Sequence, residues 1–280
     1  MVNSTSWFIL MNALRSGISL LASATFSVSE EIPFAGGMTP DPAQGSVDSS
    51  GKFVPTKVKG EISNSPTTLD ELKNSASKLI EKTGEHTFRV GTVQCDRTTR
   101  TLTIPAQVND REGLIEYALV TRQGKTHEAL LATDAAPLHV QMAALLLGMA
   151  PQPGNQNPTA VMIEVEWATN GPMRKLALAD LITLANGSPE NASDQKMARG
   201  AWNFTGSQID SRGFAAAREG SLIALIEDPA ALIVNPHPGR HDDSLHLPNA
   251  AALPGIGTPV AVRIHLRSPD ALGEKTHAQP

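Results

Sequence analysis

Short runs of alternating apolar and polar residues, separated by turns rich in Gly, Pro and Asn, dominate the chain between residues 88 and 266. In Thr101–Val108, for example, apolar residues recur at every second position. Because the side chains of a strand point alternately to its two faces, this spacing predicts strands with one buried face. Residues 137–147 have instead the apolar spacing of a helix. We therefore predict an α+β domain, a largely antiparallel β-sheet built from hairpins with one main helix (about 137–147) packed on it.

Two turn signals locate hairpins within this pattern. Asn170-Gly171 lies between two apolar runs, which is a strong hairpin signal. Gln123-Gly124 is a second tight turn, and it separates Leu114–Thr121 from Lys125–Ala132. The latter run is either the returning strand or a strand that runs into a helix. Thr87–Cys95 is expected to form one strand of a further hairpin.

The N-terminal part of the chain has a different composition. Arg15 precedes an uncharged run, residues 16–29, which is too short to cross a bilayer but fits the apolar region of a signal peptide. A periplasmic or secreted protein follows from this reading, and the alternative is a cytoplasmic protein with a disordered or loosely helical tail. The expected organisation is a signal peptide (1–29), a flexible linker (30–66), a short helix (67–84), a single domain (85–268) and a disordered tail (269–280).

Composition excludes several classes of function. Cys95 is the single cysteine, whereas an iron–sulfur cluster needs about four thiolates and a disulfide within the chain needs two. The net charge is −5, and Lys and Arg form no stripe along the chain. Aromatic residues make up only 4%, so stacking surfaces for nucleic acid are also scarce. We therefore expect no iron–sulfur cluster, no nucleic-acid partner and no transmembrane span, and the partner we expect is another envelope protein.

The first candidate site is the segment Gly124-Lys125-Thr126-His127-Glu128. In the functional interpretation, Lys125 contacts an anion, His127 is a ligand or proton carrier, and Glu128 orients the histidine. On a strand, Lys125 and His127 would share one face. The segment is not a phosphate-binding loop, because the additional glycines are missing. The alternative is a structural cluster in which His127 bonds to a neighbouring loop.

The second candidate site is a loop that holds three of the eight histidines. His237, His241 and His246, with Asp242, are ligand types that divalent metals use in proteins. The loop could fold back and bring them together. No helix or strand fixes their spacing, however, so the alternative is a solvated loop.

Catalytic residues stay unknown at this point. Ser207 lacks the Gly-x-Ser-x-Gly context of a hydrolase nucleophile. Glu164 and Glu166 would share one strand face about 7 Å apart, a spacing that can suit sugar hydrolysis but more often marks a solvated sheet face. The leading hypothesis is a non-catalytic binding or scaffold module of the cell envelope. The alternatives are a metal-dependent enzyme that uses His127 and Glu128 or the His237–His246 loop, and a purely structural module.

Several segments also resemble the YdjY-type domain of bacterial proteins. The resemblance is carried by Ile104–Asn109, Glu112–Tyr117, Gly124–Glu128 and Leu145–Gly148, and Gly-Lys-x-His-Glu is its most specific element. It implies no established reaction, and it agrees with export. Some relatives are described as ferredoxin-like, which would imply clustered cysteines; with Cys95 alone, this chain departs from that pattern.

Overall fold

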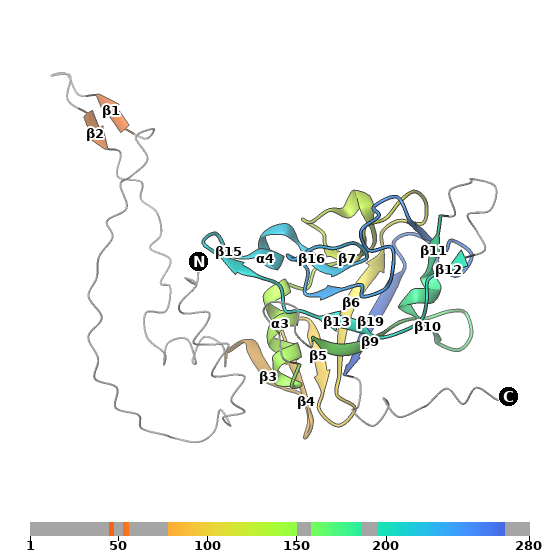
Figure 1. The fold of residues 1–280 in the computed structure, drawn as a ribbon. Helices are drawn as coiled ribbons and strands as arrows, with labels where there is room; N and C mark the ends of the chain where they lie inside the picture. Colours follow the sequence, from red (N-terminus) through yellow and green to blue (C-terminus); the bar gives the residue numbers. More distant parts are fainter. Residues whose placement is uncertain (1–44, 48–52, 56–77, 150–157, 186–194, 267–280) are drawn as a thin grey trace. The chain divides into compact units, whose positions relative to one another are not determined.

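The computed structural model describes residues 45–47, 53–55, 78–149, 158–185 and 195–266 of the chain (Figure 1). The chain divides into two units. One unit contains an antiparallel pair of short strands, β1 (Gly45–Val47) and β2 (Phe53–Pro55). Every other described element belongs to the second unit, which also carries both candidate sites.

Eight strands of the second unit close into a barrel. Each strand pairs with the next, and the last pairs with the first. In order around the barrel they are β6 (Thr101–Val108), β8 (Ala129–Thr133), β7 (Tyr117–Thr121), β16 (Ser221–Ala224), β17 (Ile233–Val234), β13 (Trp202–Phe204), β9 (Thr159–Trp167) and β19 (Pro259–Leu266).

Strand β19 closes the barrel because it pairs on both sides. Its Val262 lies opposite Ile104 of β6 and opposite Val165 of β9. All three side chains are buried, so the closing strand also contributes an apolar face to the core. Two neighbouring pairs, β7 with β8 and β16 with β17, are parallel, and the other six are antiparallel.

The remaining elements of this unit lie outside the barrel. Three strands extend the sheet beyond β6 and one extends it beyond β9, while a three-stranded sheet and a short hairpin stand apart. In that order they are β5 (Val93–Asp96), β4 (Thr87–Val90) and β3 (Ile80–Lys82); β10 (Arg174–Ala177); β12 (Gln195–Lys196), β11 (Ile182–Leu184) and β18 (His246–Pro248); and β14 (Ile209–Asp210) and β15 (Gly213–Phe214). The helices are α3 (Pro137–Leu146) and α4 (Ala215–Glu219), with the 3-10 helices η1 (Thr126–Glu128) and η2 (Leu178–Leu181).

The core follows from the alternation in the sequence. In β9 every second residue is buried, and the residues between them, which include Glu164 and Glu166, face outward. Trp202 and Phe204 of β13 pack in the core. Strands β7 and β8 are buried on both faces. Their second face belongs to a small separate cluster around Tyr117, and the candidate site lies against it.

The predicted fold class is wrong, because the sheet is a closed barrel rather than a largely antiparallel layer covered by a main helix. The structure is mostly β, and α3 is a small element that packs mainly against β4 and β5, outside the barrel. The helix itself is present at the predicted place. Pro137 occupies its first turn, and Gly148, at φ +86°, ends it with the two backbone hydrogen bonds of a Schellman motif.

Local turn signals explain which strand predictions succeeded. The Asn170-Gly171 hairpin is confirmed by the pairing of β9 with β10. The predicted single strand Thr87–Cys95 is wrong, since a tight turn at Gly91, φ +58°, folds it into β4 and β5. The predicted helix over residues 67–84 lies mostly outside the described residues, and within it Ile80–Lys82 forms strand β3.

Candidate functional site

Tyr117 lies at the centre of a polar network on the outer face of β7. The Lys125 ammonium donates a hydrogen bond to the Tyr117 hydroxyl at 2.7 Å, and that hydroxyl donates to Oδ2 of Asp228 at 3.1 Å. The second carboxylate oxygen of Asp228 accepts from the backbone N–H of Ala230 at 2.8 Å. We call Lys125, Tyr117 and Asp228 the Tyr117 network. It fixes an ammonium and a carboxylate on either side of one buried hydroxyl.

Burial and charge set the protonation of this network. Burial raises the pKa of Tyr117, and the Asp228 carboxylate raises it further, so the phenol keeps its proton. Burial alone would lower the pKa of Lys125, but the hydrogen bond to Tyr117 and the charges of Glu128 and Asp228 outweigh it and raise the pKa. Lys125 is therefore a cation at neutral pH, and it also lies 4.8 Å from the centre of the Tyr117 ring.

A direct contact between two glycines places Lys125. Gly220 has φ +74°, and a Cβ atom there would lie 2.7 Å from Cα of Gly124 and 2.5 Å from Oγ1 of Thr121. A Cβ on Gly124 would in turn meet the backbone of residues 219 and 220 at 3.1–3.2 Å. The backbones therefore touch, as only glycine permits. The chain from residue 122 to 128 then runs back along β7, so β8 is parallel to β7 and the predicted hairpin at Gln123-Gly124 is wrong.

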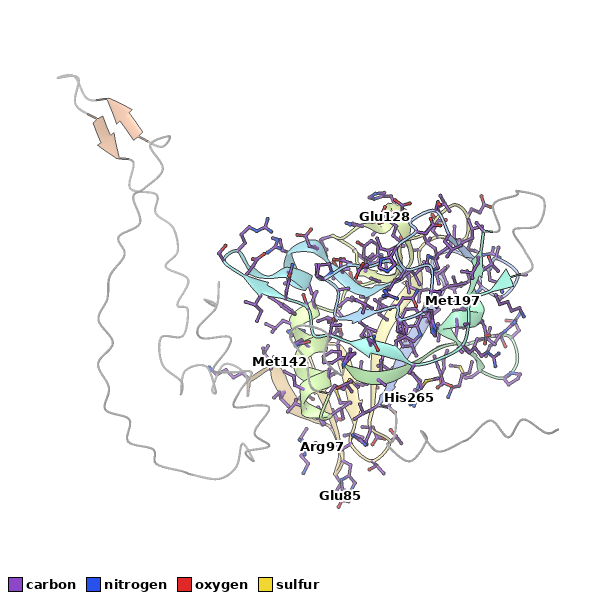
Figure 2. The ribbon with its side chains drawn as sticks, in the orientation of Figure 1. Glu85, Arg97, Glu128, Met142, Met197 and His265 are labelled. Atoms are coloured by element: carbon purple, nitrogen blue, oxygen red, sulfur yellow. The ribbon has the colours of Figure 1, made fainter. Side chains whose placement is uncertain are left out.

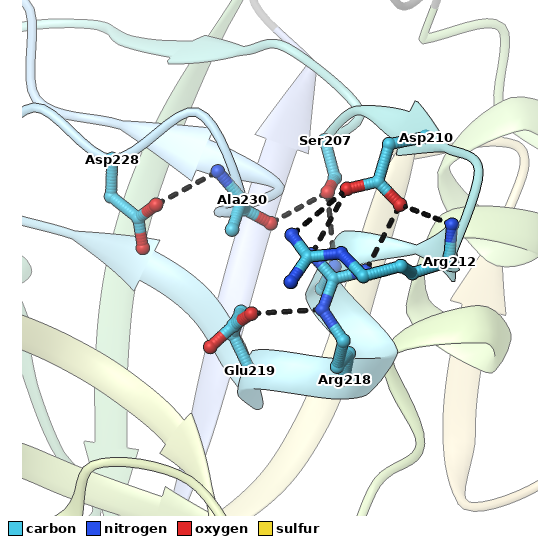
Figure 3. A network of polar contacts seen from close by, with 8 residues as sticks. Ser207, Asp210, Arg212, Arg218, Glu219, Asp228 and Ala230 are labelled. Carbon is cyan, nitrogen blue, oxygen red and sulfur yellow. Dashed lines mark hydrogen bonds and ion pairs between the residues drawn. The ribbon is translucent and has the colours of Figure 1, made fainter.

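Lys125 lines a pocket of about 190 Å³. The opposite part of the lining comes from the segment around α4, where Asp210 accepts hydrogen bonds from Arg212 and Arg218, and Arg218 also bonds to Glu219 (Figure 3). We call these four residues the Asp210 cluster. The complete lining consists of Lys125, Gln208, Arg212, Arg218, Glu219, Asp228, Pro229 and Ala230.

Ser207, beside this pocket, holds the loop together. Its φ of +62° follows Gly206 at φ +76°, so two successive residues are in the left-handed region. Its hydroxyl donates to the Ala230 carbonyl at 2.6 Å and accepts from the Ala216 N–H at 3.1 Å, as Figure 3 shows for Ala230. Since the serine hydroxyl donates its hydrogen bond to a carbonyl oxygen rather than to a base, these contacts support a structural role rather than that of a nucleophile.

The three residues predicted to bind a ligand are linked through Glu128, whose carboxylate oxygens lie 3.8 Å from Nζ of Lys125 and 3.7 Å from Nε2 of His127. They belong to a turn and 3-10 helix rather than to a strand, and Asn109 holds this turn by donating to the carbonyls of Thr126 and Ala129. Lys125 lines the pocket, while the His127 side chain is 79% exposed and contacts Glu128 at 3.7 Å. Figure 2 shows Glu128 at the end of the domain opposite to Glu85 and Arg97. Of this segment, only Lys125 reaches the pocket.

The four predicted metal ligands lie in different surroundings. His246 is buried, and burial lowers its pKa, whereas the His241 side chain is 64% exposed and pairs with Glu227 at 2.8 Å. Burial also lowers the pKa of His237, and Asp242 bonds to Ser244. Within the part of the chain that the structure describes, no group of three or more His, Cys, Asp and Glu side chains is placed to hold a metal ion. The metal site stays a prediction.

The two predicted segments nevertheless meet at one end of β7. The backbone N–H of Ile115 donates to the His246 carbonyl at 3.0 Å, and that of Glu116 donates to the Glu128 carbonyl at 2.9 Å. Burial raises the pKa of Glu116, and the charges of Glu128 and Asp243 raise it further. The Gly-Lys-x-His-Glu segment and the histidine loop are therefore neighbours, which their separation in the sequence did not reveal.

Glu164 and Glu166 belong to a different arrangement on the outer face of β9. Lys175 of β10 lies 2.6 Å from Glu164 and 3.7 Å from Glu166. On the other side, His265 of β19 lies 2.7 Å from Glu164, and Arg263 lies 3.3 Å from Glu166. We call these five residues the Glu164 cluster. Each carboxylate already faces two basic groups across the strands, which matches the solvated sheet face that was the alternative for this pair.

Cys95 is buried in the core next to the barrel. Burial raises the pKa of its thiol to about 12, although Arg97 acts in the opposite direction. The thiol is therefore protonated at neutral pH, and it packs as a small apolar side chain.

Fold and site together define a closed-barrel β domain with a polar pocket beside the barrel wall. The model of the YdjY domain matches residues 93–265, which is more than half of the chain, so the chain belongs to the YdjY domain family. A comparison with curated proteins gave no match. A comparison with solved structures gave none either. Among the helices in the described ranges, none has the length and apolar character that a membrane span requires.

Two members of the Tyr117 network escaped the sequence analysis. Tyr117 reads as an ordinary aromatic residue of a strand, and its hydroxyl becomes informative only through its partners. Asp228 lies 111 residues further along the chain, in a loop whose approach to β7 depends on the closed barrel. The Gly-Lys pair was the one local signal for this site, and it pointed to Lys125.

Proposed function

We propose that this chain is a non-catalytic binding module of the cell envelope, exported by its N-terminal segment, and that it binds a small polar ligand in the pocket beside Lys125. The observation that carries this proposal is the Tyr117 network. A side chain held in place before a ligand arrives loses less conformational entropy on binding, so a fixed ammonium and carboxylate at a pocket favour recognition.

The protonation states favour binding over catalysis. A general base must give up its proton near neutral pH, but burial raises the pKa of Tyr117 and keeps its proton in place. The Ser207 proton is used within the loop. Both groups hold the walls of the pocket in position, which is what a binding site requires.

Ligand binding is tested with the full chain and a small-molecule fraction of envelope extract. A ligand that binds only the folded state raises the melting temperature. We expect a rise for the natural sequence and none for Lys125→Met, which removes the ammonium but keeps the aliphatic stem. Lys175→Met is the matched control, since it removes an ammonium from the Glu164 cluster, whose residues do not line the pocket. Equal shifts for all three proteins would refute binding at this pocket.

Two further measurements separate this proposal from its alternatives. An alkaline phosphatase fused after the last residue should be active only while residues 1–29 are present, because the enzyme matures outside the cytoplasm. Elemental analysis of the untagged protein tests the metal-dependent alternative. About one equivalent of zinc, iron or manganese that is lost in His241→Ala or His127→Ala would replace the binding proposal with that enzyme.

A further inference from the structure

The pocket beside Lys125 presents both signs of charge to one small space. Lys125, Arg212 and Arg218 contribute positive charge, and Glu219 and Asp228 contribute negative charge. Asp210, just behind the lining, holds both arginines. The Tyr117 network and the Asp210 cluster therefore each balance their own charges, and the site as a whole is close to neutral.

Both walls keep unused hydrogen-bonding capacity. An ammonium has three donors, and Lys125 uses one of them on Tyr117, while the Glu128 carboxylate lies 3.8 Å away, beyond hydrogen-bond distance. A carboxylate can accept about four hydrogen bonds, and Asp228 accepts one from Tyr117 and one from Ala230. Among the described residues, no basic side chain lies within ion-pair distance of Asp228 (the ion pairs of this region are those of Arg212, Arg218 and Lys125). A donor and an acceptor of opposite charge are thus left to face the pocket.

We infer that the ligand, if the pocket is the binding site proposed above, is a small zwitterion of the amino-acid type. Its carboxylate would bind Lys125 and Arg212, and its ammonium would bind Asp228. A simple anion would face Asp228 and Glu219, and a simple cation would face three positive groups, so either would meet repulsion that a zwitterion avoids.

The size of the pocket agrees with a small ligand. A cavity of about 150 Å³ holds one benzene ring, and pockets for drug-sized ligands are about 300–1,000 Å³. At about 190 Å³, this pocket suits a free amino acid with a short side chain or the amino-acid end of a longer molecule. Pro229 and Ala230 supply the apolar wall for such a side chain, and the Gln208 amide can donate or accept.

Calorimetric titration of the full chain with matched probes tests the inference. Glycine, L-alanine and D-alanine carry both charges, N-acetylalanine lacks the ammonium, and alaninamide lacks the carboxylate. At least one of the three amino acids should bind about tenfold or more tightly than either blocked form. γ-Glutamylalanine, whose glutamyl end keeps both charges, distinguishes the two sources of such a group. A site for the amino-acid end of a longer molecule should bind it, whereas a site for free amino acids should bind it poorly or not at all.

Variants assign the two charges to the two walls. Asp228→Asn keeps an acceptor for Tyr117, and it should weaken the amino acid about tenfold or more without changing the weak binding of N-acetylalanine. Lys125→Met should weaken both. Arg212→Gln provides a second test of the carboxylate side with little risk to folding, because that side chain is 70% exposed. Lys175→Met should bind like the natural sequence.

The outcomes separate this inference from the proposed function. If inorganic phosphate or N-acetylalanine binds in a Lys125-dependent way while neither the amino acids nor γ-glutamylalanine do, the pocket is a binding site and the zwitterion is wrong. If every probe fails and the envelope extract still stabilises the protein through Lys125, the zwitterion is again wrong and the binding module stands. If the probes and the extract all fail, both proposals fall.

Discussion

The Tyr117 network and the Glu164 cluster both place acidic and basic side chains against the outward face of a barrel strand, yet they differ in what their charges contact. In the Glu164 cluster, Lys175, His265 and Arg263 surround the two carboxylates from neighbouring strands. In the Tyr117 network, a neutral hydroxyl stands between the ammonium and the carboxylate. The first arrangement is closed by its own ion pairs, and the second keeps donors and acceptors directed toward a pocket.

Burial sharpens this difference. Tyr117 is 1% exposed and belongs to a small apolar cluster. Its buried hydroxyl therefore destabilises the folded protein unless protein groups form hydrogen bonds with it. The Lys175 side chain is about half exposed, and water can replace its partners. Polar groups on outward strand faces therefore have different consequences, which depend on what covers the strand. The expected effects of mutation on stability rank in the same way.

The largest effect is expected where the Tyr117 network meets the barrel, at Gly220. Gly220→Ala combines a positive φ with a Cβ contact of 2.7 Å to the Gly124 backbone, which has no flexible end to move away. We expect a loss of about 2–4 kcal/mol in the free energy of unfolding, since strain and overpacking each cost about 1–3 kcal/mol. Urea unfolding followed by tryptophan fluorescence measures it.

Gly113→Ala is the matched control for this change. Gly113 has nearly the same φ, +78°, but nothing lies within 4 Å of the added Cβ atom. Its free energy of unfolding should fall only by the cost of the backbone conformation, about 1 kcal/mol. Equal losses in the two variants would show that the Gly124–Gly220 contact does not hold the Lys125 turn in place.

A smaller effect is expected when the hydroxyl at the centre of the network is removed. Tyr117→Phe leaves the Lys125 ammonium and the Asp228 carboxylate without their common partner. The expected loss in the free energy of unfolding is about 1–3 kcal/mol, the cost of leaving partly buried charged groups unsatisfied. Chemical unfolding curves measure this loss, and titration with the amino-acid probes should show weaker binding. A variant as stable as the natural protein would mean that water replaces the hydroxyl freely.

The histidine loop, which meets one end of β7, and the Glu164 cluster should respond to acid in different pH ranges. Burial lowers the pKa of His246 below its ordinary value of 6.5. Just below pH 6.5, the unfolded chain therefore binds a proton at this histidine that the folded chain does not bind. Stability should therefore fall as the pH drops below 6.5, by at most about 1.4 kcal/mol per pH unit for this group, until the pH reaches the folded pKa. His246→Asn should flatten that slope, and the part that remains belongs to His139 and His237, whose pKa values are also lowered by burial.

The Glu164 cluster should respond only in stronger acid. Burial would raise the pKa of Glu164, but Lys175 and His265 outweigh it and lower the pKa below the ordinary 4.5. A lowered carboxyl pKa gives stability that is present above pH 4.5 and is lost as the pH falls through the folded value. Glu164→Gln should change the curve only there. Thermal unfolding from pH 8 to 3 tests both ranges, and a His246→Asn curve parallel to that of the natural protein between pH 6.5 and 5 would contradict the first.

Local sequence signals predicted the elements of this fold but not its closure. Proline and glycine mark the ends of the helix at 137–146, and Asn170-Gly171 marks the hairpin of β9 and β10, because both depend on neighbouring residues. The pairing of β19 with β6 joins segments near opposite ends of the domain, and no local pattern specifies it. Likewise, a Gly turn between two apolar runs fits a hairpin as well as the short parallel connection that Gly124 and Gly220 allow here.

The residues of the candidate site divide in the same way, into those that local sequence identifies and those that depend on distant segments. Lys125 follows a glycine at a turn, so the sequence could single it out. Tyr117 and Asp228 acquire their roles through contacts between distant segments, and His127, which stood beside Lys125 in the motif, is turned outward by the 3-10 helix. A strand would have placed Lys125 and His127 on one face, whereas the tighter turn separates them.

The smallest effect is expected in the Glu164 cluster itself. Lys175→Met removes the shared basic partner of both carboxylates, but the group is half exposed, and Arg263 and His265 stay in place. We expect a change within about 1 kcal/mol, and less in high salt, because exposed ion pairs are weak and screened. Thermal unfolding at low and high ionic strength measures it. A loss above that of Tyr117→Phe would reverse the ranking of the two regions and would mean that the cross-strand ion pairs, rather than the buried hydroxyl, hold the outer face of the barrel.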